Sequence, residues 1–316
     1  MIVTVTPSPS VDRTYEIPAL APGEINRATR VHQEPGGKGV NVTRALTVNG
    51  VPSVAVFPCG GAEGDVLTAL LAEQRVLYRA VPIAGAVRVN ISVTEPGGRA
   101  TKINEPGAAL SAAELELLTS TALAAAAPKA VAAAAPGDWI VCSGSLPPGA
   151  PPDYYVSLAR RAHDAGLRFA LDTSGAALDA GLSARPNVVK PNVDELAEVT
   201  GQAITNVSEA VAGARTMLAR GAGCVVVSMG ADGALLVSPD GAWHAMGSAA
   251  RVRSTVGAGD ALLSGFLAFL AGGGTGQGAL REAVLWATAA VGVEGSRVPL
   301  IDDAARAATH ITVQRV

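Results

Sequence analysis

Residues 254–260 read Ser-Thr-Val-Gly-Ala-Gly-Asp and lead into an apolar stretch, 261–270, that predicts a helix. Two glycines around a small residue let a loop aim several backbone N–H groups at one anion, and the helix dipole strengthens that attraction. Asp260 falls in the first helical turn, where it could accept a proton from a hydroxyl group that attacks a bound phosphate. Taken alone, the stretch is more simply interpreted as a tight turn with a carboxylate at a helix N-terminus.

A second glycine-rich stretch, residues 34–41, reads Glu-Pro-Gly-Gly-Lys-Gly-Val-Asn and precedes a predicted helix over 41–49. It is not a Walker A loop, because His32 stands where that pattern needs glycine and Gly39 where it needs Ser or Thr. Its glycines allow the backbone to approach a ligand, to which Lys38 and Asn41 would add side-chain contacts. The competing interpretation is a turn with a solvated lysine.

Short apolar stretches alternate with helical patterns along most of the chain, which predicts a mainly parallel sheet with helices on both faces. The predicted strands are 3–6, 53–57, 139–142, 168–171, 188–190 and 224–228. The predicted helices are 41–49, 64–74, 112–127, 152–165 and 208–220. Residues 13–33 and 86–105 instead alternate polar and apolar side chains, which predicts a smaller, half-exposed sheet. Residues 122–137 are rich in alanine and predict a broken helix with its exit loop.

Composition excludes several classes of function. The 316 residues include 24 Lys and Arg and 27 Asp and Glu, so the net charge of −3 gives no general attraction to nucleic acid or acidic membranes. Cys59, Cys142 and Cys224 are widely spaced, which favours free thiols in a reducing compartment. Neither a secretory leader nor a membrane span is recognisable, so a cytoplasmic protein is expected. The HExxH, GxSxG and GxGxxG motifs of other enzyme classes are absent from the sequence.

The two glycine-rich stretches together resemble the GGKGxN and TxGAGD signatures of PfkB-type, ribokinase-like carbohydrate kinases, in the right order. Residues 190–195, Lys-Pro-Asn-Val-Asp-Glu, resemble the KPNxxE segment of that family, and 227–233 resemble its SxGxxG turn. Within the family, the hexose-phosphate branch is the most similar. Its segments match residues 9–12, 22–27, 103–107 and 143–149. The similarity covers essentially the whole chain.

This resemblance implies one kinase domain over 1–316, with lid strands from about 13–33 and 86–105. It implies ATP- and Mg²⁺-dependent phosphorylation of fructose 1-phosphate at the C6 hydroxyl, giving fructose 1,6-bisphosphate and ADP. Tagatose 6-phosphate or fructose 6-phosphate, phosphorylated at C1, remain alternative substrates. A nucleoside kinase or a non-catalytic sugar-phosphate sensor fits less well. The resemblance also allows a homodimer formed through the lid.

The resemblance further implies a role for each matching residue. Asp260 would be the general base, and the N–H groups of Gly257, Ala258 and Gly259 would stabilise the transferring phosphoryl group. The sugar phosphate would contact Asp12, Gly36, Gly37, Lys38, Asn41, Arg88, Asn90 and Asn104. The nucleotide would contact Lys190, Asn192, Glu195, Ser228, Gly230, Gly233, Thr255, Gly257 and Gly259. Asn192 and Glu195 would also hold Mg²⁺ through water. Ser92 replaces a lysine of the family, which increases the importance of Arg88.

Overall fold

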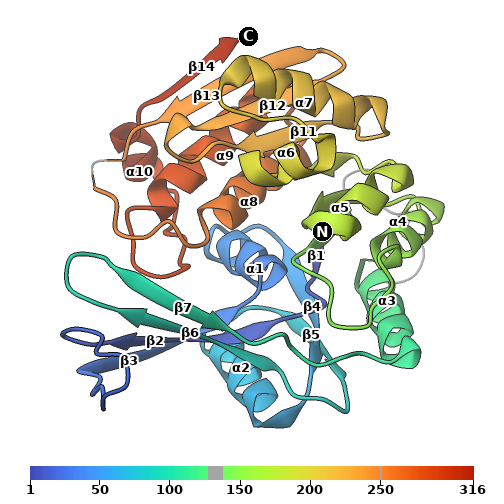
Figure 1. Ribbon diagram of the computed structural model, residues 1–316. Helices are drawn as coiled ribbons and strands as arrows, with labels where there is room; N and C mark the ends of the chain where they lie inside the picture. The colour runs from blue at the N-terminus through green and yellow to red at the C-terminus, as the bar shows by residue number, and fades with distance from the viewer. Residues whose placement is uncertain (127–137, 250) are drawn as a thin grey trace.

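The structure, a computed structural model, describes residues 1–126, 138–249 and 251–316. A ten-stranded sheet crosses the molecule in the order β14-β13-β12-β11-β10-β9-β8-β1-β4-β5 (Figure 1). The strands are β1 Ile2–Val5, β4 Ser53–Cys59, β5 Tyr78–Pro82, β8 Trp139–Ser143, β9 Arg168–Asp172, β10 Val188–Val189, β11 Val225–Ser228, β12 Ala234–Ser238, β13 Gly241–Gly247 and β14 Ile311–Arg315. From β5 to β11 all neighbours are parallel, which confirms the predicted sheet. The antiparallel edge, β12 to β14, was not predicted.

Helices cover both faces of this sheet, as predicted. They are α1 Lys38–Val48, α2 Gly61–Glu73, α3 Ala112–Ala126, α4 Tyr154–Asp164, α5 Gly175–Gly181, α6 Val193–Thr200, α7 Val207–Ala219, α8 Ala258–Ala271, α9 Gly276–Ala290 and α10 Asp303–Ala308. Two short 3-10 turns span Leu182–Ala184 and Gly230–Asp232. Successive side chains of a strand point to opposite faces, so Val3 and Val5 pack in a core with α3 to α7, whereas Ile2 packs with α1, α8 and α9.

A separate four-stranded sheet lies beside α2, in the order β3-β2-β6-β7 (Figure 1). Its strands are β2 Ser10–Glu16, β3 Arg30–Gly36, β6 Arg88–Thr94 and β7 Ala100–Asn104. Two of them extend past the expected stretch 13–33, because β2 already begins at Ser10 and β3 ends at Gly36. Asp12 and Gly36 therefore belong to the small sheet itself.

Cross-strand pairing gives the small sheet one polar face and one mainly apolar face, which also carries Arg13 and Gln33. Asp12 pairs with Asn90, and Asn90 pairs with Asn104, so these three side chains share a face. On the opposite face Ile91 pairs with Ile103, and the register extends the apolar row along Tyr15, Val31 and Val93. Ile103 is 58% exposed and Val31 is 51% exposed. The predicted alternation is thus present, and the polar face carries the expected sugar-binding residues.

Helix α1 begins three residues before the helix predicted over 41–49. Gly37 has a φ angle of 111°, which turns the end of β3 directly into the helix, and Gly37 is its N-cap. Lys38 consequently lies in the first helical turn and not in a loop. The broken helix expected over 122–137 is helical to Ala126, and the remainder lies outside the described residues. Among the helices that the structure describes, none is long and apolar enough to cross a membrane.

Candidate active site

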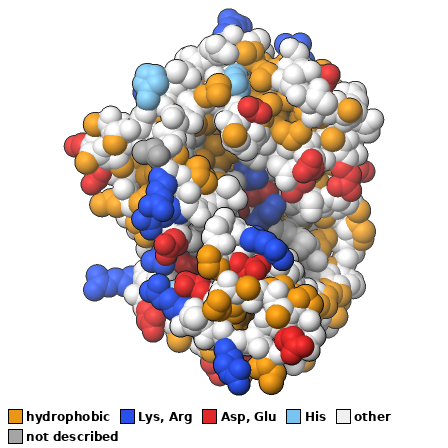
Figure 2. Space-filling view, turned by 60° about the vertical axis from the view of Figure 1, so that its left-hand side comes forward, with side chains coloured by type: hydrophobic (Ala, Val, Ile, Leu, Met, Phe, Trp, Pro, Cys, Tyr) orange, Lys and Arg blue, Asp and Glu red, His pale blue; other side chains and the backbone are white. Residues whose placement is uncertain are grey.

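The residues singled out in the sequence meet at the carboxyl ends of the parallel strands, where open α/β sheets bind their ligands. Asp172 ends β9, Asn192 follows β10 and Ser228 ends β11. The N-termini of α1 and α8 face the same region, with Lys38 and Asp260 in their first turns. Figure 2 shows acidic and basic side chains gathered in and around a hollow in the middle of one face of the molecule.

Asp260 is buried at the N-terminus of α8, with only 8% of its surface exposed. Its Oδ2 accepts a hydrogen bond of 2.8 Å from Nδ2 of Asn41. Burial raises the pKa of Asp260 to about 6, and the negative charge of Asp172 adds to the rise, whereas the Asn41 hydrogen bond and the Lys190 and Lys38 charges oppose it. A carboxylate with a pKa near neutrality is well suited to take a proton from a hydroxyl group.

The glycine-rich segment at the start of α8 allows a ligand to approach the backbone closely. Gly257, the N-cap of α8, has a φ of 78°, and a Cβ atom there would lie 3.2 Å from Cα of Ser296. A side chain at this position would therefore meet backbone strain and a tight contact with Ser296. A Cβ atom on Gly259 would lie 3.6 Å from Nζ of Lys190, so a cation faces the loop. The N-terminus of α8 and this cation together favour a bound anion.

Asp172, which was not predicted as a site residue, lies at the centre of the charged cluster. It is completely buried. Its Oδ1 accepts a hydrogen bond from Nζ of Lys38 at 3.0 Å and forms an ion pair with Nζ of Lys190 at 3.2 Å. Its Oδ2 is buried and has no partner within the described part of the chain. The available signal was a charged residue placed directly after the apolar strand predicted over 168–171.

Lys38 follows Gly37 at the start of α1, and its ammonium group reaches the acidic side of the cluster. Its Nζ contacts Asp172 and also Oε1 of Glu195, at 3.5 Å. Burial acts to lower the pKa of Lys38, but the charges of Asp172 and Glu195 outweigh it and raise this pKa well above its ordinary value. The ammonium group therefore stays charged and partly neutralises the two carboxylates.

Asn192 and Glu195 form a reciprocal capping box at the N-terminus of α6. Oδ1 of Asn192 accepts from the Glu195 N–H at 2.7 Å, and Oε2 of Glu195 accepts from the Asn192 N–H at 2.8 Å. A parallel bridge joins Asn192 to Ser228, which brings the KPNxxE segment against the SxGxxG turn. In that turn Gly233 has a φ of 82°, and a Cβ atom there would overlap the carbonyl oxygen of Ala245. The two segments therefore lie side by side at the carboxyl ends of β10 and β11.

The acidic oxygens fit a divalent cation held partly by water. Oδ2 of Asp172 is buried and has no partner among the described residues. Lys38 contacts both Asp172 and Glu195, so these two carboxylates lie close together. Within the described ranges no group of three His, Cys, Asp or Glu side chains could hold a metal unaided. Phosphate oxygens and water would have to complete the coordination, as is usual for Mg²⁺.

The polar face of the small sheet presents the expected sugar-binding groups. Oδ1 of Asp12 accepts from Ser10 Oγ at 2.7 Å and from Asn90 Nδ2 at 2.9 Å, which fixes the carboxylate. A Cβ atom on Gly36 would overlap that carboxylate, so only glycine fits there. Asn104 is exposed on the neighbouring strand.

Arg88, at the start of β6, is half-buried at the edge of the same face. It donates from Nη1 to Glu105 O at 3.1 Å and from Nη2 to Ser8 O at 3.3 Å. Nη1 and Nη2 each carry two N–H groups and each donates one hydrogen bond within the described residues, so part of the donor capacity of Arg88 remains for a ligand.

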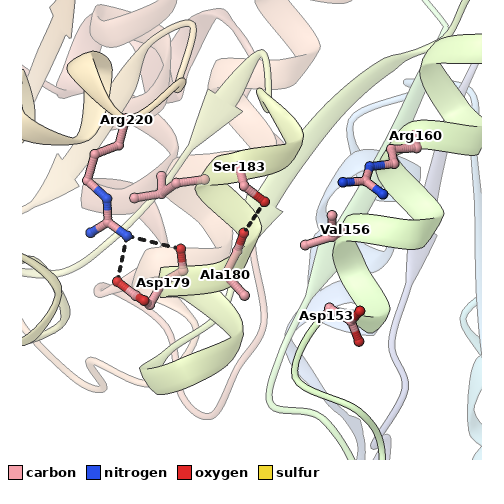
Figure 3. Close-up of a pocket in the computed structure, with 8 residues that line it drawn as sticks. Asp153, Val156, Arg160, Asp179, Ala180, Ser183 and Arg220 are labelled. Carbon is pink, nitrogen blue, oxygen red and sulfur yellow. Dashed lines mark hydrogen bonds and ion pairs between the residues drawn. The ribbon is translucent and has the colours of Figure 1, made fainter.

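A second hollow, of about 420 Å³, lies between α4, α5 and the end of α7 (Figure 3). Asp153, Val156 and Arg160 line one side of it, and Asp179 and Arg220 line the other. Arg220 contacts Asp179 at 2.6 Å and also donates to two backbone carbonyls, so its charge is already compensated. The hollow shares no residue with the charged cluster.

Fold and site together define a carbohydrate kinase: the pattern described as pfkB family carbohydrate kinase matches residues 7–303, and the chain belongs to that family. A relative from Rhodobacter capsulatus, named 1-phosphofructokinase, is 36% identical over 99% of this chain and 97% of its own. ATP-dependent 6-phosphofructokinase isozyme 2 of Escherichia coli is 33% identical over 96% of each chain. The crystal structure of Escherichia coli phosphofructokinase-2 in complex with substrates and products matches with a TM-score of 0.88, at 32% identity over 96% of this chain and 97% of that one.

Proposed function

We propose that this protein transfers the γ-phosphoryl group of ATP to the C6 hydroxyl of fructose 1-phosphate, giving fructose 1,6-bisphosphate and ADP. The observation that carries the proposal is Asp260, a buried carboxyl in the first turn of α8, where Gly259 faces Lys190. The names of several relatives, among them the Rhodobacter capsulatus protein, support this acceptor.

In this mechanism the oxygen of the sugar hydroxyl bonds to the γ-phosphorus while Asp260 accepts the proton of that hydroxyl. The bond from that phosphorus to the bridging oxygen of ADP breaks on the opposite side, in line with the attack. The N–H groups of Gly257, Ala258 and Gly259, together with Lys190, stabilise the charge on the transferring group. Asp12, Asn90 and Asn104 orient the sugar, and Ser228, Gly230 and Gly233 support the nucleotide.

A divalent cation completes this proposal. Asp172, Asn192 and Glu195 would hold Mg²⁺, in part through water, and the ion would supply neutralisation of the phosphate charge. The three cysteines are free, which supports a reducing, cytoplasmic compartment for the reaction.

An acceptor panel tests the proposed substrate. ADP release is measured with fructose 1-phosphate, fructose 6-phosphate, tagatose 6-phosphate, fructose and ribose. The highest kcat/KM is expected with fructose 1-phosphate. A preference for fructose 6-phosphate or tagatose 6-phosphate would keep the family and replace the substrate, and a preference for an unphosphorylated sugar would refute the hexose-phosphate assignment.

Glu195→Gln is expected to raise the Mg²⁺ concentration needed for half-maximal rate by about tenfold, the scale of one lost charged contact. Glutamine serves a capping box as well as glutamate does, so α6 should remain capped and only the charge is removed. The measurement is initial rate against free Mg²⁺, with thermal unfolding as the control for the fold. An unchanged Mg²⁺ requirement would assign Glu195 to helix capping alone.

Arg88→Ala is expected to raise KM for fructose 1-phosphate by at least about tenfold, the scale of one charge-assisted hydrogen bond. A substrate phosphate must meet fixed donors to offset its lost hydration. Nη1 and Nη2 of Arg88 each keep one N–H that no described residue accepts, beside the polar face of the small sheet. KM for ATP should change little. Fructose without phosphate provides the matched control: an equal loss with both sugars would make Arg88 a residue that shapes the sheet and not a phosphate anchor.

The apolar face of the small sheet supports a homodimer. Ile103 and Val31 are more than half exposed there; Ile103 lies opposite Ile91, and Val31 lies opposite Tyr15. Ile103→Lys is expected to convert a dimer to a monomer in light scattering, because a charge at an apolar contact is costly to bury. Leu117→Lys, which changes a residue of α3 that is 44% exposed, is the control and should leave the mass unchanged. A wild-type monomer at micromolar concentration, or a dimer that survives Ile103→Lys, would refute this contact.

A further inference from the structure

Arg44 is a buried arginine that has no role in the mechanism proposed above. It lies on α1 three residues after Asn41, so the two side chains share one side of the helix. Only 5% of Arg44 is exposed, which is rare for this residue type. A charge in such a position needs fixed partners.

The partners of Arg44 are oxygen atoms from four parts of the chain. Nη1 donates to Asn41 Oδ1 at 3.1 Å, to the carbonyl of Pro35 at 3.1 Å and to Ser296 Oγ at 2.9 Å. Nε donates to Gln74 Oε1 at 2.8 Å. Nη2 lies 3.6 Å from Glu34 Oε1. The guanidinium is thus held in a single place.

This place determines how the amide of Asn41 is oriented. A guanidinium has no acceptor atom, so Asn41 must turn its oxygen toward Arg44 and its nitrogen the other way. The nitrogen then donates to Oδ2 of Asp260 at 2.8 Å. A rotated amide would set two donors together at Arg44 and two acceptors together at Asp260, both unfavourable in a buried site.

We propose that Arg44 is a positioning residue for catalysis: it fixes the Asn41 amide so that this amide holds Oδ2 of Asp260 and leaves Oδ1 for the proton of the sugar hydroxyl. The inference rests on the proposed role of Asp260 as the base.

The contacts from Arg44 through Asn41 to Asp260 form a relay, and other charges surround both of its ends. Asp260 is faced by Asp172 from β9, Lys190 after β10 and Lys38 from α1. Arg44 is faced by Glu34 from β3, Asp12 from β2 and Arg297 after α9. A substitution of Arg44 leaves the groups around Asp260 in place, apart from the Asn41 amide. Loss of that donated hydrogen bond would therefore raise the pKa of Asp260, and the acidic limb of the rate profile would move to higher pH.

The test is a double-mutant cycle of Arg44→Met and Asn41→Ala, with kcat measured as a function of pH. Arg44→Met alone is expected to lower kcat by about tenfold to a hundredfold, the scale of one charge-assisted contact, and to move the acidic limb to higher pH with KM for ATP unchanged. In the Asn41→Ala background Arg44→Met should change kcat by less than about twofold, because the relay is already broken. Gln74→Leu, which removes only the partner of Nε, is the control and should leave kcat and the pH profile as in wild type.

The inference is overturned if Arg44→Met retains wild-type kcat and pH profile, or if its full effect persists in Asn41→Ala. Should Arg44→Met fail to fold, Arg44→Lys, which keeps the charge but not the planar fork, replaces it in the cycle with the same criterion. Asp260→Asn is measured alongside. If that variant stays active, the proposed base and this inference both fail; if it loses activity while the Arg44 effect ignores Asn41, only this inference fails.

Discussion

Asp260→Asn is expected to lower kcat by about 10²–10⁴-fold, the contribution of a well-placed general base. The variant keeps the size and shape of the side chain, and its amide oxygen can still accept from Asn41 Nδ2. Nucleotide affinity should therefore be preserved. Steady-state kinetics with a direct ATP-binding measurement checks both statements, and a variant with more than a third of wild-type kcat, when chemistry limits the rate, would remove Asp260 from the mechanism.

The pH dependence of wild type supplies a second check on the same residue. The pKa of Asp260 is about 6, so kcat/KM should fall as the pH is lowered through 6 and the carboxylate becomes protonated. The residual activity of Asp260→Asn should lack this limb. A wild-type profile that stays flat down to pH 5 would contradict the assignment.

The same substitution should not weaken the fold. A carboxyl whose pKa is higher in the folded protein than in the unfolded chain costs stability at any pH above its folded value, because folding then opposes its ionisation. At about pH 7.5 the ionised Asp260 is such a group, whereas the amide of the Asp260→Asn variant carries no charge. The midpoint of thermal unfolding should thus be equal or higher in the variant, which separates lost chemistry from lost structure.

Asp172→Ala is expected to reduce the free energy of unfolding by about 3–5 kcal/mol, the cost of leaving a buried charge without its partner. Lys190 is only 3% exposed, and Asp172 is its ion-pair partner at 3.2 Å. Lys38 loses a contact as well. Urea denaturation at pH 7 gives the magnitude, and the double variant with Lys190→Met should recover much of the loss because it removes the stranded charge.

Asp179→Ala is the matched control for Asp172→Ala. Its ion pair with Arg220 is shorter, at 2.6 Å, but the two side chains are 57% and 35% exposed, in the hollow of Figure 3. A solvent-exposed pair contributes about 0–1 kcal/mol, so this variant should unfold almost as wild type does. Equal costs for Asp172→Ala and Asp179→Ala would mean that Lys190 finds solvent or another partner, and that burial does not make Asp172 important.

The family and the principal motifs were accessible from the sequence because they depend on local chemistry. A phosphate-binding segment needs glycines that bring backbone N–H groups together and a carboxylate in the next helical turn. Residues 254–260 supply both consecutively. The alternation of apolar strands and helices likewise predicted the parallel sheet. The antiparallel edge was not predicted. The strand Ala234–Ser238 is as apolar as a parallel strand, so its residue pattern does not indicate its direction.

Tertiary structure decided which charges meet, because those contacts join residues far apart in the chain. Lys38 and Asp172 are 134 residues apart, Asn41 and Asp260 are 219 apart, and Arg44 and Ser296 are 252 apart. Their encounters depend on the order of the strands in the sheet and on how α1 and α8 pack against it. Consecutive residues were therefore enough to predict an aspartate behind a glycine-rich segment, suited to phosphoryl transfer. Only the packed sheet and helices determined that a buried Asp172 joins two lysines and that Arg44 holds the amide beside that aspartate.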